Sequence, residues 1–120
     1  MREITIGAVR YLVSASEHGG TWTASATRAD TGERFGVECS GETEAQAVDR
    51  LTEWLRWQDE HTLALSALQR AERDYHRTIA GSAFVGPSEG PSAVEMQKES
   101  LDLVEAARQR LDEVRARRPN

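Results

Sequence analysis

The chain has 120 residues, 38% hydrophobic and 29% charged, which fits one domain or a small domain with a helical extension. Its net charge of −5 disfavours nonspecific nucleic-acid binding, and no apolar run approaches the ~20 residues that span a bilayer, so we expect neither nucleic acid nor membrane as a partner. Cys39 is the single cysteine, which excludes a disulfide within the chain, and residues 1–6 lack the features of a signal peptide, so we expect a cytoplasmic protein.

The first third of the chain alternates between apolar and polar residues with the period of a β-strand. Three segments show this alternation, at residues 8–16, 21–27 and 34–39. The side chains expected to face inward are Val9, Tyr11, Val13, Trp22, Ala24, Ala26, Phe35, Val37 and Cys39. Ile4 and Ile6 extend the first strand or lead into it. Glycine-containing turns at residues 17–20 and 30–32 join the segments, and because short loops join antiparallel strands, we predict a three-stranded antiparallel meander.

The period of the pattern changes after Gly41 from that of a strand to that of a helix. Thr43 and Gln46 have the spacing of a capping box, which predicts a helix start. Apolar residues then recur at helical spacing, namely Ala47, Val48, Leu51, Trp54 and Leu55. We expect this stripe to cover the apolar face of the sheet, because a sheet of three strands needs such a cover in water.

The helical pattern continues beyond the residues needed to cover the sheet. No glycine or proline occurs in residues 42–80, whereas residues 81–91 contain three glycines and two prolines and are expected to end the helix. The continuing helix has a narrower stripe, formed by Leu65, Leu68, Tyr75 and Ile79. A second helix is predicted over residues 92–117, with a seam of Val94, Leu101, Val104, Leu111 and Val114 and with Ala107 as a small filler.

These elements predict an α+β fold, in which a three-stranded antiparallel meander is covered by a long helix that continues into an antiparallel helical hairpin. We expect a sheet-plus-helix module at residues 1–58 and a hairpin at residues 59–120, with a connector at residues 81–91. Because two thin seams bury little apolar area, the hairpin is expected to pack against the sheet, a second copy or another protein. Self-association is the simplest of these arrangements.

Several aromatic and aliphatic residues are candidates for binding a partner. Trp54 and Trp57 are either anchors for a partner or a stacked ligand, or core residues where the sheet module meets the hairpin. Phe84 and Val85 either fold back on the hairpin or form an exposed docking hook. The full set of interaction candidates is Trp54, Trp57, Leu65, Leu68, Tyr75, Ile79, Phe84, Val85, Leu101, Val104 and Leu111.

Three groups of residues carry possible chemistry, each with a structural alternative. Cys39 precedes a helix start and is either a reactive thiol or an inward-facing strand residue. His61, Glu72 and His76 share roughly one helix face and either bind a metal or form an ordinary polar surface. The C-terminal arginines, Arg108, Arg110, Arg115, Arg117 and Arg118, either contact phosphates or pair with the acidic residues between them. With no phosphate loop, serine elbow or paired-cysteine motif, we expect neither an enzyme nor a cofactor.

The stretch of residues 8–58 resembles the HicB-like antitoxin modules, in which a strand meander leads through a Gly-x-Thr-x-x-x-Ala turn into a covering helix. The matching residues are Gly41-Glu42-Thr43-Glu44-Ala45-Gln46-Ala47. The resemblance implies binding of a small toxin. The chain departs from these modules after the helix, where a hairpin replaces their short fourth strand and their DNA-binding element. The double-stranded-RNA-binding module has a similar strand order, but the chain lacks its first helix and its lysine cluster.

Taken together, these features predict a non-enzymatic protein that binds other proteins or assembles with itself, as a homodimer or a larger complex. The alternatives are an antitoxin-like regulator that binds a toxin or other effector, and a metal-binding helical site at His61, Glu72 and His76.

Overall fold

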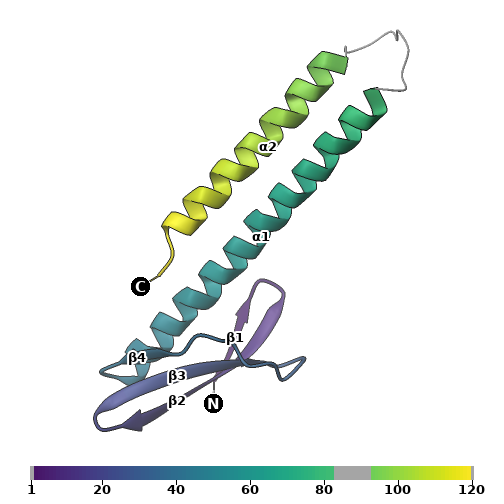
Figure 1. Cartoon of the computed structure of the whole chain (residues 1–120). Coiled ribbons are helices and arrows are strands. Elements are labelled where there is room, and N and C mark those ends of the chain that lie inside the picture. Colours follow the sequence, from purple (N-terminus) through teal and green to yellow (C-terminus); the bar gives the residue numbers. More distant parts are fainter. Residues whose placement is uncertain (1, 83–92, 120) are drawn as a thin grey trace. The chain divides into compact units, whose positions relative to one another are not determined.

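The structure is a computed structural model that describes residues 2–82 and 93–119. The chain forms two compact units (Figure 1). The sheet unit contains the residues before Glu60 together with the C-terminal residues from Arg118 on, and the hairpin unit is Glu60–Arg117. Helix α1 (Glu44–Ser82) contributes its first part to the sheet unit and its remainder to the hairpin unit. The α+β composition agrees with the prediction.

The sheet has four strands in the order β1-β2-β3-β4, and every neighbouring pair is antiparallel. The strands are β1 (Arg2–Ile6), β2 (Val9–His18), β3 (Thr21–Arg28) and β4 (Cys39–Gly41). The predicted number of three strands is therefore wrong, although the predicted segments 8–16 and 21–27 correspond to β2 and β3. Ile4 and Ile6 belong to β1, a separate strand.

Two tight turns set the register of the first three strands. Gly7, with φ of 59°, begins the two-residue turn between Ile6 and Val9, which pair with each other. Gly19 and Gly20 have φ of 60° and 84°, the conformation of a type I′ hairpin turn, and they join His18 to Thr21. Positive φ at these positions favours glycine, because a Cβ atom would be strained there.

The prediction of a regular strand over residues 34–39 is also wrong. Only an isolated bridge joins Arg34 to Thr27, and regular pairing resumes where Cys39 faces Ala24. Two residues lie between Ala24 and Thr27 on β3, whereas four lie between their partners Arg34 and Cys39. The segment before β4 therefore has two extra residues, which bulge from the ladder. An even insertion preserves the alternation of faces, which explains why the sequence pattern resembled a continuous strand.

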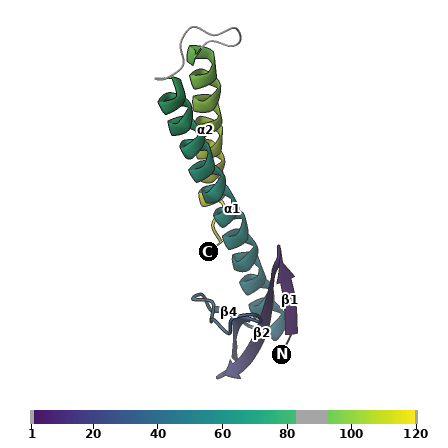
Figure 2. The same ribbon diagram turned by 90° about the vertical axis from the view of Figure 1, so that its right-hand side faces the viewer.

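The first part of α1 lies against one face of the sheet, as Figure 2 shows. The core consists mainly of the predicted inward residues: Ile6, Val13, Ala24, Ala26, Cys39, Ala47, Val48, Leu51 and Leu55 are buried. The Thr43 hydroxyl accepts a hydrogen bond from the Gln46 amide at 3.1 Å, which confirms the predicted cap. The Gln46 side chain in turn accepts from the Glu42 amide at 2.7 Å. A Cβ atom on Gly41 would lie 2.7 Å from the Ala47 nitrogen, so only glycine fits at this crossing.

The hairpin unit pairs the second part of α1 with α2 (Ala93–Ala116). The contacts between the helices include Thr78 to Ser100 at 3.2 Å, His61 to Arg115 at 3.4 Å, and Glu60 to Arg117 at 3.5 Å. As the residue number rises on α2 it falls on α1, so the two helices run antiparallel within this unit (Figure 1).

The seam between these helices follows spacings of three and four residues, as in a coiled coil. In the hairpin unit, the buried and half-buried residues that follow this spacing on α1 are His61, Ala64, Leu68, Ala71, Tyr75 and Thr78, and those on α2 are Gln97, Ser100, Val104, Ala107, Leu111 and Val114. The predicted seam is correct from Val104 onward but wrong before it, because Val94 is 74% exposed and Leu101 is 40% exposed. Continuing the spacing backwards from Val104 reaches Ser100 and Gln97 instead.

Candidate functional site

The largest exposed apolar side chains gather in the hairpin unit. Among the described residues, the exposed large hydrophobic side chains are Leu63, Ile79, Val94, Met96, Leu101 and Leu103, and all of them belong to the hairpin unit. Leu63 and Leu103 are the most exposed of the leucines, each at 64%. Their restriction to one unit makes that unit the candidate for contact with another protein.

One row of exposed residues on α2 repeats the coiled-coil spacing beside the seam. We call this row the α2 edge; it consists of Met96, Glu99, Leu103, Ala106, Arg110 and Glu113. Each member precedes a seam residue by one position, and every member is exposed. A helix with two neighbouring rows of this spacing can contact one helix on each side, as helices in bundles do.

The other side of the hairpin carries a second, less exposed apolar group. Ile79 on α1 and Leu101 on α2 are each 40% exposed and flank the Thr78–Ser100 contact. The remaining interaction candidates divide between the interior and the boundary of the seam. Leu68, Val104 and Leu111 are buried, whereas Leu65 and Tyr75 are half-buried. Phe84 and Val85 lie outside the described residues.

In the sheet unit, the two predicted tryptophans line an open hollow of about 470 Å³. Trp54 and Trp57 lie edge to face, with ring centroids 5.8 Å apart, and Trp54 also packs against the core. The guanidinium of Arg118 lies 5.3 Å from the centroid of the Trp54 ring, a cation–π contact. The remaining lining residues are Tyr11, Arg28, Glu33, Arg34, Phe35, Gly36, Val37 and Gln58.

Sequence reasoning missed the contribution of the strands to this hollow. The sequence predicts Tyr11 and Phe35 only as inward-facing residues of their strands. The register brings them together, since Tyr11 pairs with Arg28 and the Phe35 amide donates to the Ala26 carbonyl at 2.8 Å. The pairing of β2 with β3 and the hydrogen bond from Phe35 to β3 bring both rings to the hollow that the tryptophans line.

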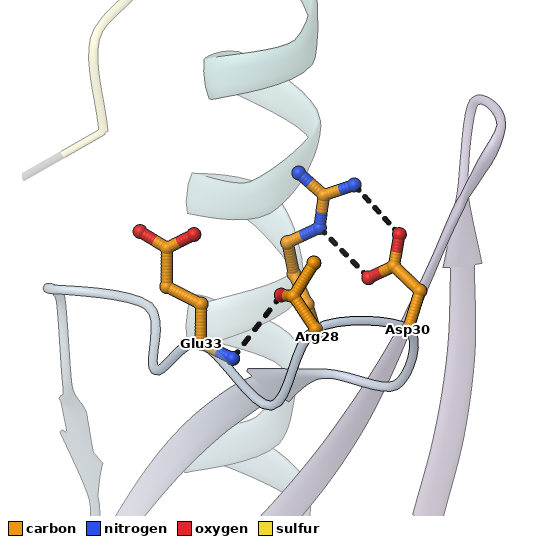
Figure 3. A network of polar contacts seen from close by, with 4 residues as sticks. Arg28, Asp30 and Glu33 are labelled. Carbon is orange, nitrogen blue, oxygen red and sulfur yellow. Dashed lines mark hydrogen bonds and ion pairs between the residues drawn. The ribbon is translucent and has the colours of Figure 1, made fainter.

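The two arginines that line this hollow, Arg28 and Arg34, form ion pairs with Asp30 and Glu38, which are not lining residues. The Arg28 guanidinium donates two hydrogen bonds to the Asp30 carboxylate, at 3.1 and 2.9 Å (Figure 3). These bonds hold the pKa of Asp30 below its ordinary value and raise that of Arg28. The Glu33 amide donates to the Thr31 hydroxyl at 3.2 Å and closes the same loop. The hollow therefore presents aromatic surface beside two arginines that are already paired.

Cys39 lies in the core, and burial raises the pKa of its thiol. A raised pKa keeps the thiol protonated at neutral pH, which favours the structural interpretation over a reactive thiol.

The candidate metal ligands are not brought together. Within residues 2–82 and 93–119, no three His, Cys, Asp or Glu side chains gather in a group able to hold a metal ion. His61 lies in the hairpin seam near Arg115, and the His76 ring has its centroid 5.9 Å from that of Tyr75.

Of the C-terminal arginines, Arg110, Arg115 and Arg117 have polar partners within the chain. Arg115 contacts His61, Arg117 lies 3.5 Å from Glu60, and Arg110 lies 3.9 Å from Glu113. Because these pairs are exposed, each contributes little stability. The Arg110–Glu113 pair is of the kind that the sequence offers as one alternative, an arginine paired with an acidic residue of the same helix.

Comparison with protein-family models, with curated proteins and with solved structures gives no match. The resemblance to HicB-like antitoxins therefore stays a prediction. Across the described residues, the helices are too polar or too short to form a membrane-spanning segment.

Proposed function

We propose that the protein is a non-enzymatic assembly protein that self-associates through its hairpin unit. The observation that carries this proposal is the confinement of the exposed large hydrophobic side chains, within the described residues, to Glu60–Arg117. Burying such side chains is the main favourable contribution to protein association.

The composition of the seam supports the same proposal. Ala64, Ala71 and Ala107 occupy positions where a stable pair of helices usually has larger residues, and Thr78 faces Ser100. A side chain of leucine size contributes about 1.5–3 kcal/mol when it is buried, and alanine contributes much less. A two-helix unit with this seam gains stability if a further helix covers its apolar edges.

The proposal is tested by the mass of the purified chain in solution. Multi-angle light scattering across the range of ~1–100 μM is expected to give at least twice the chain mass of 13.3 kDa at the upper concentrations. A mass of one chain throughout this range would overturn the proposal.

A second candidate function rests on the aromatic hollow of the sheet unit. We propose that Trp57 and Tyr11 there contact a separate effector. The resemblance to HicB-like antitoxins implies an effector of this kind, a small toxin. Co-expression with the product of the neighbouring gene tests this candidate. A complex that is lost in a Trp57→Ala variant supports it, whereas the absence of a complex with the wild-type chain removes it.

A further inference from the structure

We propose that the partner of the hairpin unit is a second copy of the chain, docked antiparallel along the α2 edge. This inference rests on the proposed self-association and adds the surface, the direction and the register. The α2 edge is the candidate surface because all members of that row are exposed and have coiled-coil spacing.

The charge distribution along α2 selects the direction of pairing. Residues 93–105 contain four acidic residues and one lysine, a net charge of −3, whereas residues 106–117 contain four arginines and two acidic residues, a net charge of +2. Parallel copies would place like charges beside each other. Antiparallel copies place the acidic half of one α2 beside the basic half of the other, so the charges are complementary.

The spacing of the α2 edge then gives one register between the two antiparallel α2 helices, centred on the midpoint of each helix. Pairing each position of the row with the corresponding position of an antiparallel copy brings Leu103 against the second copy's Ala106. The same register brings Glu99 against the second copy's Arg110, and Met96 against its Glu113. Two-fold symmetry produces each of these contacts twice. The symmetry axis passes between Val104 and Glu105, which is also the midpoint of α2.

The opposite side of α2 does not offer the same match. Its exposed residues at alternating spacings of four and three include Val94, Lys98, Leu101, Glu105 and Arg108. An antiparallel pairing on that side, centred on the same point of the helix, would place Glu105 beside the second copy's Glu105, a repulsive contact, and Leu101 against its Arg108 rather than against an apolar residue. The α2 edge is therefore the better surface for a second copy.

A charge exchange tests the register. Glu99→Arg and Arg110→Glu, each alone, are expected to raise the dimer dissociation constant roughly threefold to tenfold, because each creates two like-charge contacts. The double variant exchanges the two signs and is expected to return the constant to within about twofold of wild type. Circular dichroism of each variant establishes that the helices remain folded. A double variant that associates no better than the single ones would overturn the inference.

Two spin-label distances test the direction. In a Cys39→Ala background, labels at position 95 are expected about 30 Å apart and labels at position 105 about 10 Å apart, given a rise of 1.5 Å per residue and a helix spacing of about 10 Å. Parallel copies would give similar distances at both positions. A wild-type chain that remains monomeric overturns both the proposed function and this inference. A dimer with two similar distances overturns only the inference.

Discussion

The hydroxyl oxygens of Thr78 and Ser100 lie 3.2 Å apart across the seam between α1 and α2. Thr78 also donates its hydroxyl hydrogen to the Asp74 carbonyl, at 2.9 Å. A hydroxyl has one hydrogen to donate, so Ser100 is the donor in the contact between the two side chains. The hairpin thus has a polar contact at positions where a coiled coil usually has apolar ones.

Replacing this polar pair tests its energetic role. Ser100→Ala removes the donor and is expected to lower the free energy of unfolding by about 0.5–1 kcal/mol. The double variant Thr78→Val/Ser100→Ala removes both hydroxyls and is expected to be at least as stable as wild type, because both positions become apolar at similar volume. Urea unfolding of the three proteins provides the measurement. A double variant less stable than Ser100→Ala would contradict this interpretation.

Gly41 is predicted to tolerate no side chain. In Gly41→Ala the new Cβ would lie 2.7 Å from the Ala47 nitrogen, so β4 and α1 must separate, at an expected cost of about 2–3 kcal/mol. Gly36→Ala is the matched control, because a Cβ there meets no atom within 4 Å and Gly36 does not have a positive φ. The control is expected to be neutral or stabilising by up to about 1 kcal/mol. Equal midpoints of thermal unfolding for the two variants would show that the close approach is unimportant.

The cap at the start of α1 should be measurable in the same way. Thr43→Ala removes the acceptor for the Gln46 amide and is expected to cost about 1 kcal/mol, while Thr43→Ser keeps the hydroxyl and most of the stability. Thr62→Ala, at an exposed position inside the same helix, is the control and should be neutral or slightly stabilising. Chemical denaturation of wild type and the three variants measures the free energy of unfolding. A similar loss of this free energy in Thr43→Ala and Thr43→Ser would contradict the role of the hydroxyl.

Cys39 is predicted to be unreactive and to affect the pH dependence of stability. Burial raises the pKa of the folded thiol above its unfolded value, so its stabilising contribution is complete below the unfolded pKa and is lost as the pH rises through the folded one. The free energy of unfolding of wild type should therefore fall more steeply above about pH 8.5 than that of Cys39→Ala. Rapid modification of the native thiol by a disulfide reagent at pH 7 would show instead that it is accessible and ionised.

The sequence predicted the parts of the fold that depend on local pattern. The alternation around Val13 and Ala24 located β2 and β3, and the Thr43–Gln46 spacing located the start of α1. Gly7 and Ala8 do not form a strong turn signal, so the break between β1 and β2 was missed.

The remaining errors depend on relations that a local pattern does not contain. The even bulge before Cys39 leaves the alternation of faces unchanged, so the pattern there resembled a strand. The seam of α2 was misassigned at Leu101 because hydrophobicity favoured it over Ser100, whereas the spacing from Val104 favours Ser100. Trp54 and Trp57 were identified as possible anchors, but the hollow that they line depends on the strand register.

Self-association along the α2 edge of the hairpin is tested most directly by comparing two leucines of equal exposure. Leu103 and Leu63 are each 64% exposed, but only Leu103 lies on the α2 edge. Sedimentation equilibrium of wild type, Leu103→Glu and Leu63→Glu at ~1–100 μM measures the dimer dissociation constant of each. Burying the exposed part of two copies of Leu103 is worth about 2–4 kcal/mol, so Leu103→Glu should raise the constant at least tenfold while Leu63→Glu leaves it within about twofold of wild type. A monomeric wild type, or equal effects of the two substitutions, would contradict the account.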